Sequence, residues 1–556
     1  MPYNLNLAQL QIYDDRTLPQ RAKPGSKGDI IELPPELLLL PLDYLDRHDL
    51  CNLSQTCSAL HRLVSSYWVR YNRLNPHPSL SLHLARSTRW TGLDVARYDH
   101  LSDQTWTRRS FNSVSLPPTV KFHGGGGIPR PYMAISETRL IVFAGRELES
   151  IRWTADGGYI REGVGSWKSP AGGSHHLEIP DDSNIPVTGR AAMDITGAAF
   201  VPDGGKDETI CLATADGQLV RCALSFNPPS HSTDVHRKAK KTPKLGSIDV
   251  VEVAHLPHPV GTSITTLASS GNTLLTLASK VSQPSSAVSL STDNPTSSLS
   301  TRETLVSLYT ASDYDSQGTV SRLTLPGKPT SAHVSIPGAY VAIGTSQRYV
   351  RRTAAVDSFG DTTTSLQPTT VAQAPLSIYA IAPDGLSDAP LRSLTTIHAV
   401  SPTPYAICSP CPSSPAGPSP YLLLSGWYDS HVHLHDLRTS EPKPVMSWHD
   451  PWLDDPVYSL SSCTTNIVAG MGQHGIVAIF DVRIKSPLST NNAGRIGFSA
   501  YSPEGDGSPV YAIHAEASRI WGLSRGLFLL DFGPSDVCSR GRELFYNHTV
   551  RYITQS

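Results

Sequence analysis

The stretch from Leu33 to Leu63, LPPELLLLPLDYLDRHDLCNLSQTCSALHRL, has more apolar positions than one face of one helix can hold. Pro34 and Pro35 suit the first turn of a helix, and Asp46 suits the N-cap of a second helix. Apolar residues spaced alternately three and four positions apart predict that the second helix is amphipathic. Its apolar stripe is Leu50, Leu53, Cys57, Leu60 and Val64. A unit of about 45 residues cannot bury this surface alone, so we expect it to dock onto a partner or a neighbouring domain.

The carboxyl-terminal part of the chain repeats a pattern of short strands. The segment SGWYDSHVHLHDLR, from Ser425, aligns without gaps with GMGQHGIVAIFDVR, from Gly470, and this places Asp436 45 residues before Asp481. A second repeated motif occurs as PVYSL and later as PVYAI, and each copy precedes a further pair of apolar strands. Repeats of 40 to 50 residues with about four short strands are typical of the blades of a β-propeller, which stack in a ring.

Weaker matches extend this pattern toward the amino terminus. Candidate strands begin at Arg139, Thr209, Ser263, Glu303, Ala339 and Ser377. We therefore predict a mainly β fold, a propeller of about seven blades preceded by a small all-α segment, with six or eight blades as alternatives. Two packed sheets with irregular strands are the other architecture that the pattern allows.

The same patterns divide the chain into parts. We expect a flexible tail at 1–28, the helical module at 29–73, a linker at 74–125, the propeller at 126–535, and a tail or closing strand at 536–556. Segments without hydrophobic periodicity are predicted to be loop insertions. They are 226–249, which holds the basic run HRKAKKTPK, 281–302, 352–375 and 409–420.

Composition narrows the class of protein. Charged residues are 17% of the chain, with 41 Gly and 45 Pro, which favours turns and short strands. A net charge of −2 gives no reason to expect nucleic acid or a membrane surface as a partner. We expect no secretory signal and no transmembrane helix. Eight scattered cysteines fit a reducing compartment, so we expect a cytoplasmic or nuclear protein, or both.

One strand offers candidate metal ligands. Alternation places His431, His433 and His435 on one face, a spacing that suits a metal-dependent hydrolase. The aligned strand of the next repeat is apolar there, which favours a structural role. Cys408 and Cys411 form a single C-x-x-C, which is interpreted as a free pair. We therefore predict no catalytic, cofactor-binding or metal-binding residue and no cofactor.

The helical segment resembles a known family. L-P-x-E-L-L, a Leu twelve residues after the first, and D-L-x-x-L-S-x-T-C-x-x-L-x-x-L follow the order of an F-box. F-box proteins bind the Skp adaptor of SCF-type cullin–RING ubiquitin ligases. The resemblance implies adaptor-binding residues at Leu33, Pro34, Leu37, Leu38, Leu42, Leu45, Leu50, Leu53, Cys57 and Leu60. Pro41 stands where the family usually has Ile or Val, and Leu60 stands where Trp is frequent.

The strand ending D-[LV]-R resembles the WD-repeat family, in degenerate form because His435 and Phe480 replace the usual Trp. An F-box followed by such a propeller resembles the substrate receptors of SCF ligases. This implies a non-catalytic chain that binds the Skp adaptor and, through its propeller, a target protein. The alternative is a propeller scaffold outside such ligases. Arginines near predicted turns are Arg348, Arg351, Arg352 and Arg525, but no target-binding residue is assigned; Arg438 and Arg483 are expected to be structural.

Overall fold

The computed structural model describes residues 39, 41–42, 45, 47–74, 79–90, 92–116, 130–167, 194–228, 245–259, 262–281, 302–309, 321–346, 349–352, 365–368, 374–396, 402–412, 414, 419–483, 497–503 and 507–533. The chain forms two compact units. The helical unit comprises Met1–Leu74 with Thr91–Ala96, and the β unit comprises Asn75–Trp90 with Arg97–Ser556. Among the described helices, none has the length and apolar character needed to cross a membrane.

The helical unit contains α2 (Arg47–Thr56) and α3 (Ser58–Leu74). The sequence predicts one helix here, and the structure corrects this to two that meet at Cys57. The Thr56 hydroxyl donates to the Leu53 carbonyl at 2.7 Å, and the Cys57 sulfur accepts from the Leu60 amide at 3.5 Å. Cys57 thus caps α3 and interrupts the apolar stripe. The first predicted helix lies outside the described residues, except for Leu39, Pro41 and Leu42.

Most of the described residues in the segment predicted as a linker belong to the β unit. It contains α4 (Leu80–Thr88) and α5 (Gly92–Thr107), whose residues from Arg97 onward belong to this unit. At the start of α4, the Ser81 amide donates to a carboxylate oxygen of the buried Glu516 at 2.8 Å, and the Ser81 hydroxyl donates to the other. At the end of α5, the Trp106 ring stacks on Phe532 with centroids 3.5 Å apart.

The described strands of the propeller fall into seven consecutive sheet units of about four strands, the first two of which are joined into one eight-stranded sheet. The first two are β2 (Tyr132–Ile135), β3 (Arg139–Ala144), β4 (Glu147–Trp153) and β5 (Tyr159–Ser166), and β6 (Ile195–Phe200), β7 (Thr209–Thr214), β8 (Leu219–Asn227) and β9 (Gly246–His255). The third is β10 (Ser263–Ser270), β11 (Thr273–Val281), β12 (Arg302–Tyr309) and β13 (Ser321–Pro326). The fourth is β14 (Lys328–Ser335), β15 (Tyr340–Ser346), β18 (Leu376–Ala382), β19 (Gly385–Leu386) and β20 (Arg392–Leu394).

The fifth sheet unit is β21 (Pro404–Cys408), β22 (Leu422–Trp427), β23 (Val432–Asp436) and β24 (Met446–Trp448). The sixth is β25 (Val457–Cys463), β26 (Asn466–Met471), β27 (Ile476–Asp481) and β28 (Gly497–Tyr501). The seventh is β29 (Ala512–Ala515), β30 (Arg519–Leu523) and β31 (Leu527–Asp531), completed by β1 (Asn112–Leu116). The mainly β propeller fold that the repeats predict is thus confirmed, and the blade number of the whole chain stays a prediction.

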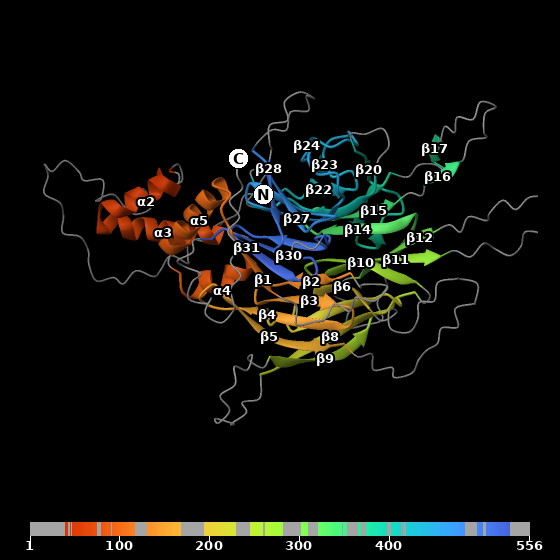
Figure 1. The fold of residues 1–556 in the computed structure, drawn as a ribbon, viewed down its shortest axis with the longest axis horizontal. Helices are drawn as coiled ribbons and strands as arrows, with labels where there is room; N and C mark the ends of the chain where they lie inside the picture. The colour runs from red at the N-terminus through yellow and green to blue at the C-terminus, as the bar shows by residue number, and fades with distance from the viewer. Residues whose placement is uncertain are drawn as a thin grey trace, which may run out of the picture. The chain divides into compact units, whose positions relative to one another are not determined.

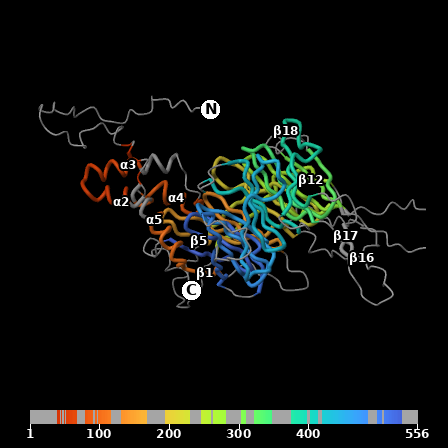
Figure 2. The backbone as a smooth tube through the Cα atoms, turned by 90° about the horizontal axis from the view of Figure 1, so that it is seen from above, coloured from red at the N-terminus to blue at the C-terminus, as the bar shows by residue number. Residues whose placement is uncertain are grey.

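The sheet units follow one another around a ring. The first strand of each unit from β2 to β25 contacts the first strand of the next unit. Each pair of neighbouring units encloses an apolar cluster, because both faces of a central sheet must be covered. The seventh unit packs against the first, where the rings of Trp521 and Trp153 have centroids 5.0 Å apart. Figure 2 shows these orange and blue segments side by side.

The ring is closed by a strand from the amino-terminal side. β1 pairs antiparallel with β31, from Asn112 opposite Asp531 to Leu116 opposite Leu527. Figure 1 shows the orange β1 beside the blue β30 and β31. The predicted boundary at residue 126 is therefore corrected, because the propeller includes a strand from the predicted linker. The segment 536–556, the predicted alternative for closure, lies outside the described residues.

Two predicted insertions contain strands. β9 begins at Gly246, inside 226–249, and pairs with β8. Inside 352–375, β17 (Ser365–Pro368) pairs with β16 (Tyr349–Arg352). The described residues of 409–420 form neither helix nor strand. Most of 281–302 and the whole predicted tail 1–28 lie outside the described residues.

Candidate protein-binding sites

The helical unit has a small core of its own. Leu42, Leu50, Val64 and Tyr67 form a buried cluster. Four half-buried leucines, Leu39, Leu45, Leu53 and Leu63, pack around it. All members of this cluster come from the helical segment, so its leucines cover one another.

The structure divides the residues that the F-box resemblance assigns to adaptor binding. Leu33, Pro34, Leu37 and Leu38 lie outside the described residues. Leu42 and Leu50 are each only 2% exposed, so they stabilise the core instead of offering contact area. The half-buried members, which still present surface to a partner, are Leu45, Leu53, Cys57 and Leu60.

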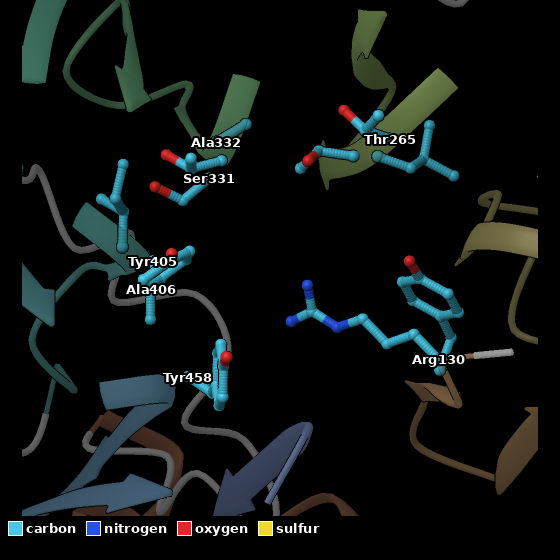
Figure 3. A pocket seen from close by; sticks show the side chains of 12 residues that line it. Arg130, Thr265, Ser331, Ala332, Tyr405, Ala406 and Tyr458 are labelled. Carbon is cyan, nitrogen blue, oxygen red and sulfur yellow. The ribbon is translucent and has the colours of Figure 1, made fainter. Parts of the chain in front are cut away.

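A second candidate site lies in the β unit, where the first strands of several sheet units converge. We call it the channel pocket, a cavity of about 190 Å³. It is lined by Arg130, Tyr132, Thr265, Thr266, Leu267, Thr330, Ser331, Ala332, Tyr405, Ala406, Ile407 and Tyr458. Arg130 lies just before β2. The other lining residues lie on the first strands β2, β10, β14, β21 and β25. Figure 3 shows Arg130 extending into the space that Tyr405, Tyr458 and Ser331 face from the other side.

The charged group in the described lining of the channel pocket is positive. Arg130 is exposed and is the cation of the lining, and none of the described carboxylates lines the pocket. Its guanidinium carbon lies 5.9 Å from the centre of the Tyr132 ring. Burial raises the pKa of Tyr132, and Arg130 opposes that rise. Burial likewise raises the pKa of Tyr405, with contributions from Tyr458 and Tyr428, again opposed by Arg130. The phenols therefore stay protonated at neutral pH and can donate hydrogen bonds.

Four tyrosines form a series of neighbouring rings that includes two residues of this pocket, and we call them the tyrosine arc. Their ring centroids are separated by 6.1 Å from Tyr428 to Tyr405, 5.2 Å from Tyr405 to Tyr458, and 6.4 Å from Tyr458 to Tyr511. Tyr428, between β22 and β23, is 56% exposed. Rigid aromatic side chains that combine an apolar ring with a polar tip are frequent anchors at protein interfaces.

The sequence analysis does not identify the channel pocket or the tyrosine arc. A signal is present: Tyr132 and Tyr405 directly follow a proline, and Tyr458 and Tyr511 follow Pro-Val. Each motif lies at the start of a first strand. Proline is tolerated there because the first residue of a strand need not donate to the ladder.

The arginines considered from the sequence lie elsewhere. Arg525 is exposed in the turn between β30 and β31, and it does not line the channel pocket. Arg348 lies outside the described residues, as do the side chains of Arg351 and Arg352. Arg438 and Arg483 each hold the aspartate two residues earlier, Asp436 and Asp481, at 2.7 and 2.6 Å. This equivalent geometry in two repeats agrees with their expected structural role.

The histidine strand is part of a sheet. His433 and His435 on β23 are fully buried, and each ring has a hydroxyl partner. His433 Nδ1 lies 2.6 Å from Ser447 Oγ, and His435 Nε2 lies 3.0 Å from Ser425 Oγ. Among the described residues no group of three or more His, Cys, Asp or Glu side chains is arranged to hold a metal. The described arrangement thus gives the hydrolase alternative no support.

The C-x-x-C pair is also enclosed. Cys408 and Cys411 are free cysteines, and burial raises the pKa of Cys408 to about 12. A thiol with such a pKa is almost entirely protonated at neutral pH and is a poor nucleophile and metal ligand. Both residues pack beside the fifth and sixth sheet units, where the Cys411 amide donates to Ser462 Oγ at 2.7 Å.

Comparison with known families agrees with this division of the chain. Residues 30–73, which include α2 and much of α3, match the F-box-like family model. The chain thus carries an F-box-like domain in front of a β-propeller. Over 116 residues, 20% of the chain, it is 34% identical to "F-box/WD repeat-containing protein 4" from Homo sapiens and from Mus musculus. The chain spans about a quarter, 26%, of the length of these relatives.

One solved structure can be compared over a longer stretch. It is titled "Crystal structure of WD40 beta propeller domain of Doa1", and it aligns with 76% of this chain and 98% of its own. The TM-score is 0.42 and the sequence identity is 9%.

Proposed function

We propose that this protein is a substrate receptor of an SCF-type cullin–RING ubiquitin ligase. The F-box-like domain binds a Skp adaptor, and the propeller binds the target protein. The observation that carries the proposal is the presence of an F-box-like domain at residues 30–73 and a closed propeller in one chain. The similarity to an F-box/WD repeat-containing protein supports it.

In this role the chain performs no chemistry itself. It brings a lysine of the bound target close to the ubiquitin-loaded enzyme, which converts a bimolecular transfer into an effectively intramolecular one. The contacts of Ser81 and Trp106 with the seventh sheet unit make α4 and the end of α5 part of the propeller unit. The proposed function places the protein in the cytoplasm, the nucleus or both.

The adaptor contact can be tested with the half-buried leucines. The double change Leu53→Asp and Leu60→Asp puts two charges on surface that would face the adaptor, and we expect co-purification with Skp to fall at least tenfold. The double change Gln55→Asp and Ser58→Asp is the charge-matched control, because both residues are exposed and lie close to Leu53 and Leu60 in the sequence. We expect it to leave co-purification unchanged.

Equal adaptor recovery with the double variant and with the control would contradict the ligase assignment. It would favour the scaffold alternative, for which the self-contained leucine cluster around Leu42 and Leu50 is the supporting observation. Circular dichroism and the unfolding temperature of the β unit must match the unmodified protein, so that lost binding is not mistaken for lost folding.

A further inference from the structure

The channel pocket has the composition of an anion site. Its lining combines one guanidinium with the hydroxyl groups of tyrosines, threonines and a serine, and it includes no carboxylate. Two of these hydroxyls already donate to the Pro404 carbonyl, Thr330 at 2.6 Å and Ser331 at 3.0 Å. The phenols of Tyr132, Tyr405 and Tyr458 and the guanidinium of Arg130 therefore remain the main groups that define what the pocket accepts. Charge complementarity calls for a negatively charged partner group.

The amount of positive charge in the pocket distinguishes between two kinds of anion, a carboxylate and a phosphate group. Arg130 is a single cation, and among the described residues no other lysine or arginine lines the cavity. A carboxylate carries one charge and pairs with one guanidinium through two parallel hydrogen bonds. A phosphate group carries about −1.5 to −2 at neutral pH, so one arginine would leave part of its charge uncompensated. The pocket therefore matches a carboxylate.

The surroundings of the pocket indicate what carries that carboxylate. The tyrosine arc provides ring faces from Tyr511 to the exposed Tyr428. Its three ring-to-ring steps together correspond to at most about five residues of extended chain. A free metabolite would leave this aromatic surface uncovered, whereas a peptide segment would cover it. Aromatic-lined grooves bind proline and apolar residues in extended segments.

We propose that the channel pocket binds the carboxylate of a Glu or Asp side chain in an extended segment of a protein, whose neighbouring proline or apolar residues stack on the tyrosine arc. This inference rests on the proposed function, because it describes how the propeller recognises its target. Arg130 pairs with the carboxylate, and the phenols of Tyr405 and Tyr458 donate the remaining hydrogen bonds.

The test uses the full chain and four fluorescent libraries of eight-residue peptides. The central residue is fixed as Glu, Gln, phosphoserine or Lys, and the flanking positions are random mixtures rich in Pro, Leu and Ala. We expect the Glu library to be retained at least five times more than each of the other three. Arg130→Gln should abolish the difference between the Glu and Gln libraries, and Tyr458→Ala should lower retention of every library.

Arg108→Gln is the matched control. Arg108 is exposed at the end of α5, away from the pocket lining, and its loss should leave the preference for Glu intact. Arg130→Lys keeps the charge but loses the two parallel hydrogen bonds, so it should retain part of the preference. An unchanged unfolding temperature of each variant shows that the propeller is intact.

Three results would overturn the proposal: equal retention of the Glu and Gln libraries, preference for phosphoserine, or an unchanged preference in Arg130→Gln. Absence of retention for all four libraries also counts against it. Adaptor co-purification is measured on the same preparations. Failed peptide binding with intact adaptor binding refutes the pocket assignment alone, whereas lost adaptor binding refutes the ligase role.

Discussion

His435 illustrates how a residue substitution can preserve a structural function. The sequence places it where WD repeats usually carry Trp, and Phe480 occupies the aligned position of the next repeat. The structure shows that both side chains are buried, at 1% and 3% exposure. His435 lies within hydrogen-bond distance of Ser425, whose hydroxyl also accepts from the indole of Trp427 at 2.8 Å. A polar group therefore occupies this core position, and the folded state becomes less stable at acidic pH because burial disfavours the protonated ring.

Replacing His435 by Phe, the residue of the next repeat, should lower the free energy of unfolding by about 1 kcal/mol at pH 7.5, because one buried hydrogen bond is lost. At pH 5 the difference from the unmodified protein should shrink or reverse. Burial lowers the pKa of His435 to about 4, so the folded protein resists a protonation that the unfolded chain accepts. Urea titrations at the two pH values measure both effects.

The control for this substitution is His83→Phe, since His83 is exposed on α4. Because this side chain is exposed, the change should alter the free energy of unfolding at pH 7.5 by less than about 0.5 kcal/mol. A His435→Phe protein that loses the same stability at pH 5 as at pH 7.5 would show that His435 does not titrate in the unfolding transition.

At the scale of elements, the short strand β1 closes the ring by pairing with β31. It is five residues long, yet it supplies the outer strand of the seventh sheet unit. Leu116 on β1 is 2% exposed and packs in the cluster between the seventh and first units. Closure of the ring therefore depends on the burial of a short segment that lies far from its partner in the sequence.

Leu116→Ala should lower the free energy of unfolding of the β unit by about 3 kcal/mol, because it leaves a cavity at the ring closure. Leu391→Ala makes the same chemical change at a position that is 60% exposed, and it should cost less than 1 kcal/mol. Denaturant unfolding monitored by tryptophan fluorescence compares the two variants, since Trp153 and Trp521 lie in the same cluster as Leu116. Equal losses would mean that β1 is not needed for a stable ring.

The same elements show what the sequence can and cannot predict. The hairpins β22–β23 and β26–β27 are predicted because each has an apolar run followed by a turn, and because the two sequences align without gaps. β1 is missed because NSVSL has only two strongly apolar residues and its partner follows more than 400 residues later. β9 is missed because its alternating exposed residues resemble the polar loop before it. Interruption of the helix at Cys57 depends on a sulfur cap that propensities do not encode.

The two candidate sites also differ in how far the sequence predicts them. The F-box-like segment is recognised from an ordered series of local residues, and the family comparison confirms it. The list of adaptor-binding residues stays a prediction, and packing removes Leu42 and Leu50 from the accessible set. The channel pocket is assembled from first strands that are distributed over more than 300 residues of sequence. Only the closed ring brings Arg130 to the tyrosines of later sheet units.

At the scale of the whole molecule, half-buried and buried histidines are distributed around the ring of described strands. Burial lowers the pKa to about 4 for His258, near β10, for His333 on β14, for His435 on β23 and for His514 on β29; Arg322 adds to the effect at His258. In an unfolded chain these residues would titrate near 6.5. Their neutral forms thus stabilise the fold fully above pH 6.5, and that contribution is lost progressively as the pH falls toward 4.

The propeller should therefore lose stability steadily between pH 6.5 and pH 4, before most carboxylates are protonated. The unfolding temperature, measured by calorimetry at half-unit steps of pH, should be constant from pH 8 to pH 7 and decline below pH 6.5. Added salt should not remove the decline, because it arises from burial and not from exposed ion pairs. A flat profile down to pH 4.5 would contradict this prediction.

Pairing of β1 with β31 also has a consequence for biosynthesis. Residue 116 leaves the ribosome long before residue 527, and at about 5 to 20 residues per second the interval is roughly 20 to 80 s. During that time β1 lacks its partner strand, and a chain terminated before β30 would never acquire it. Such a truncated product would still contain the whole F-box-like domain. A truncated product of this kind would thus carry an F-box-like domain without a closed propeller.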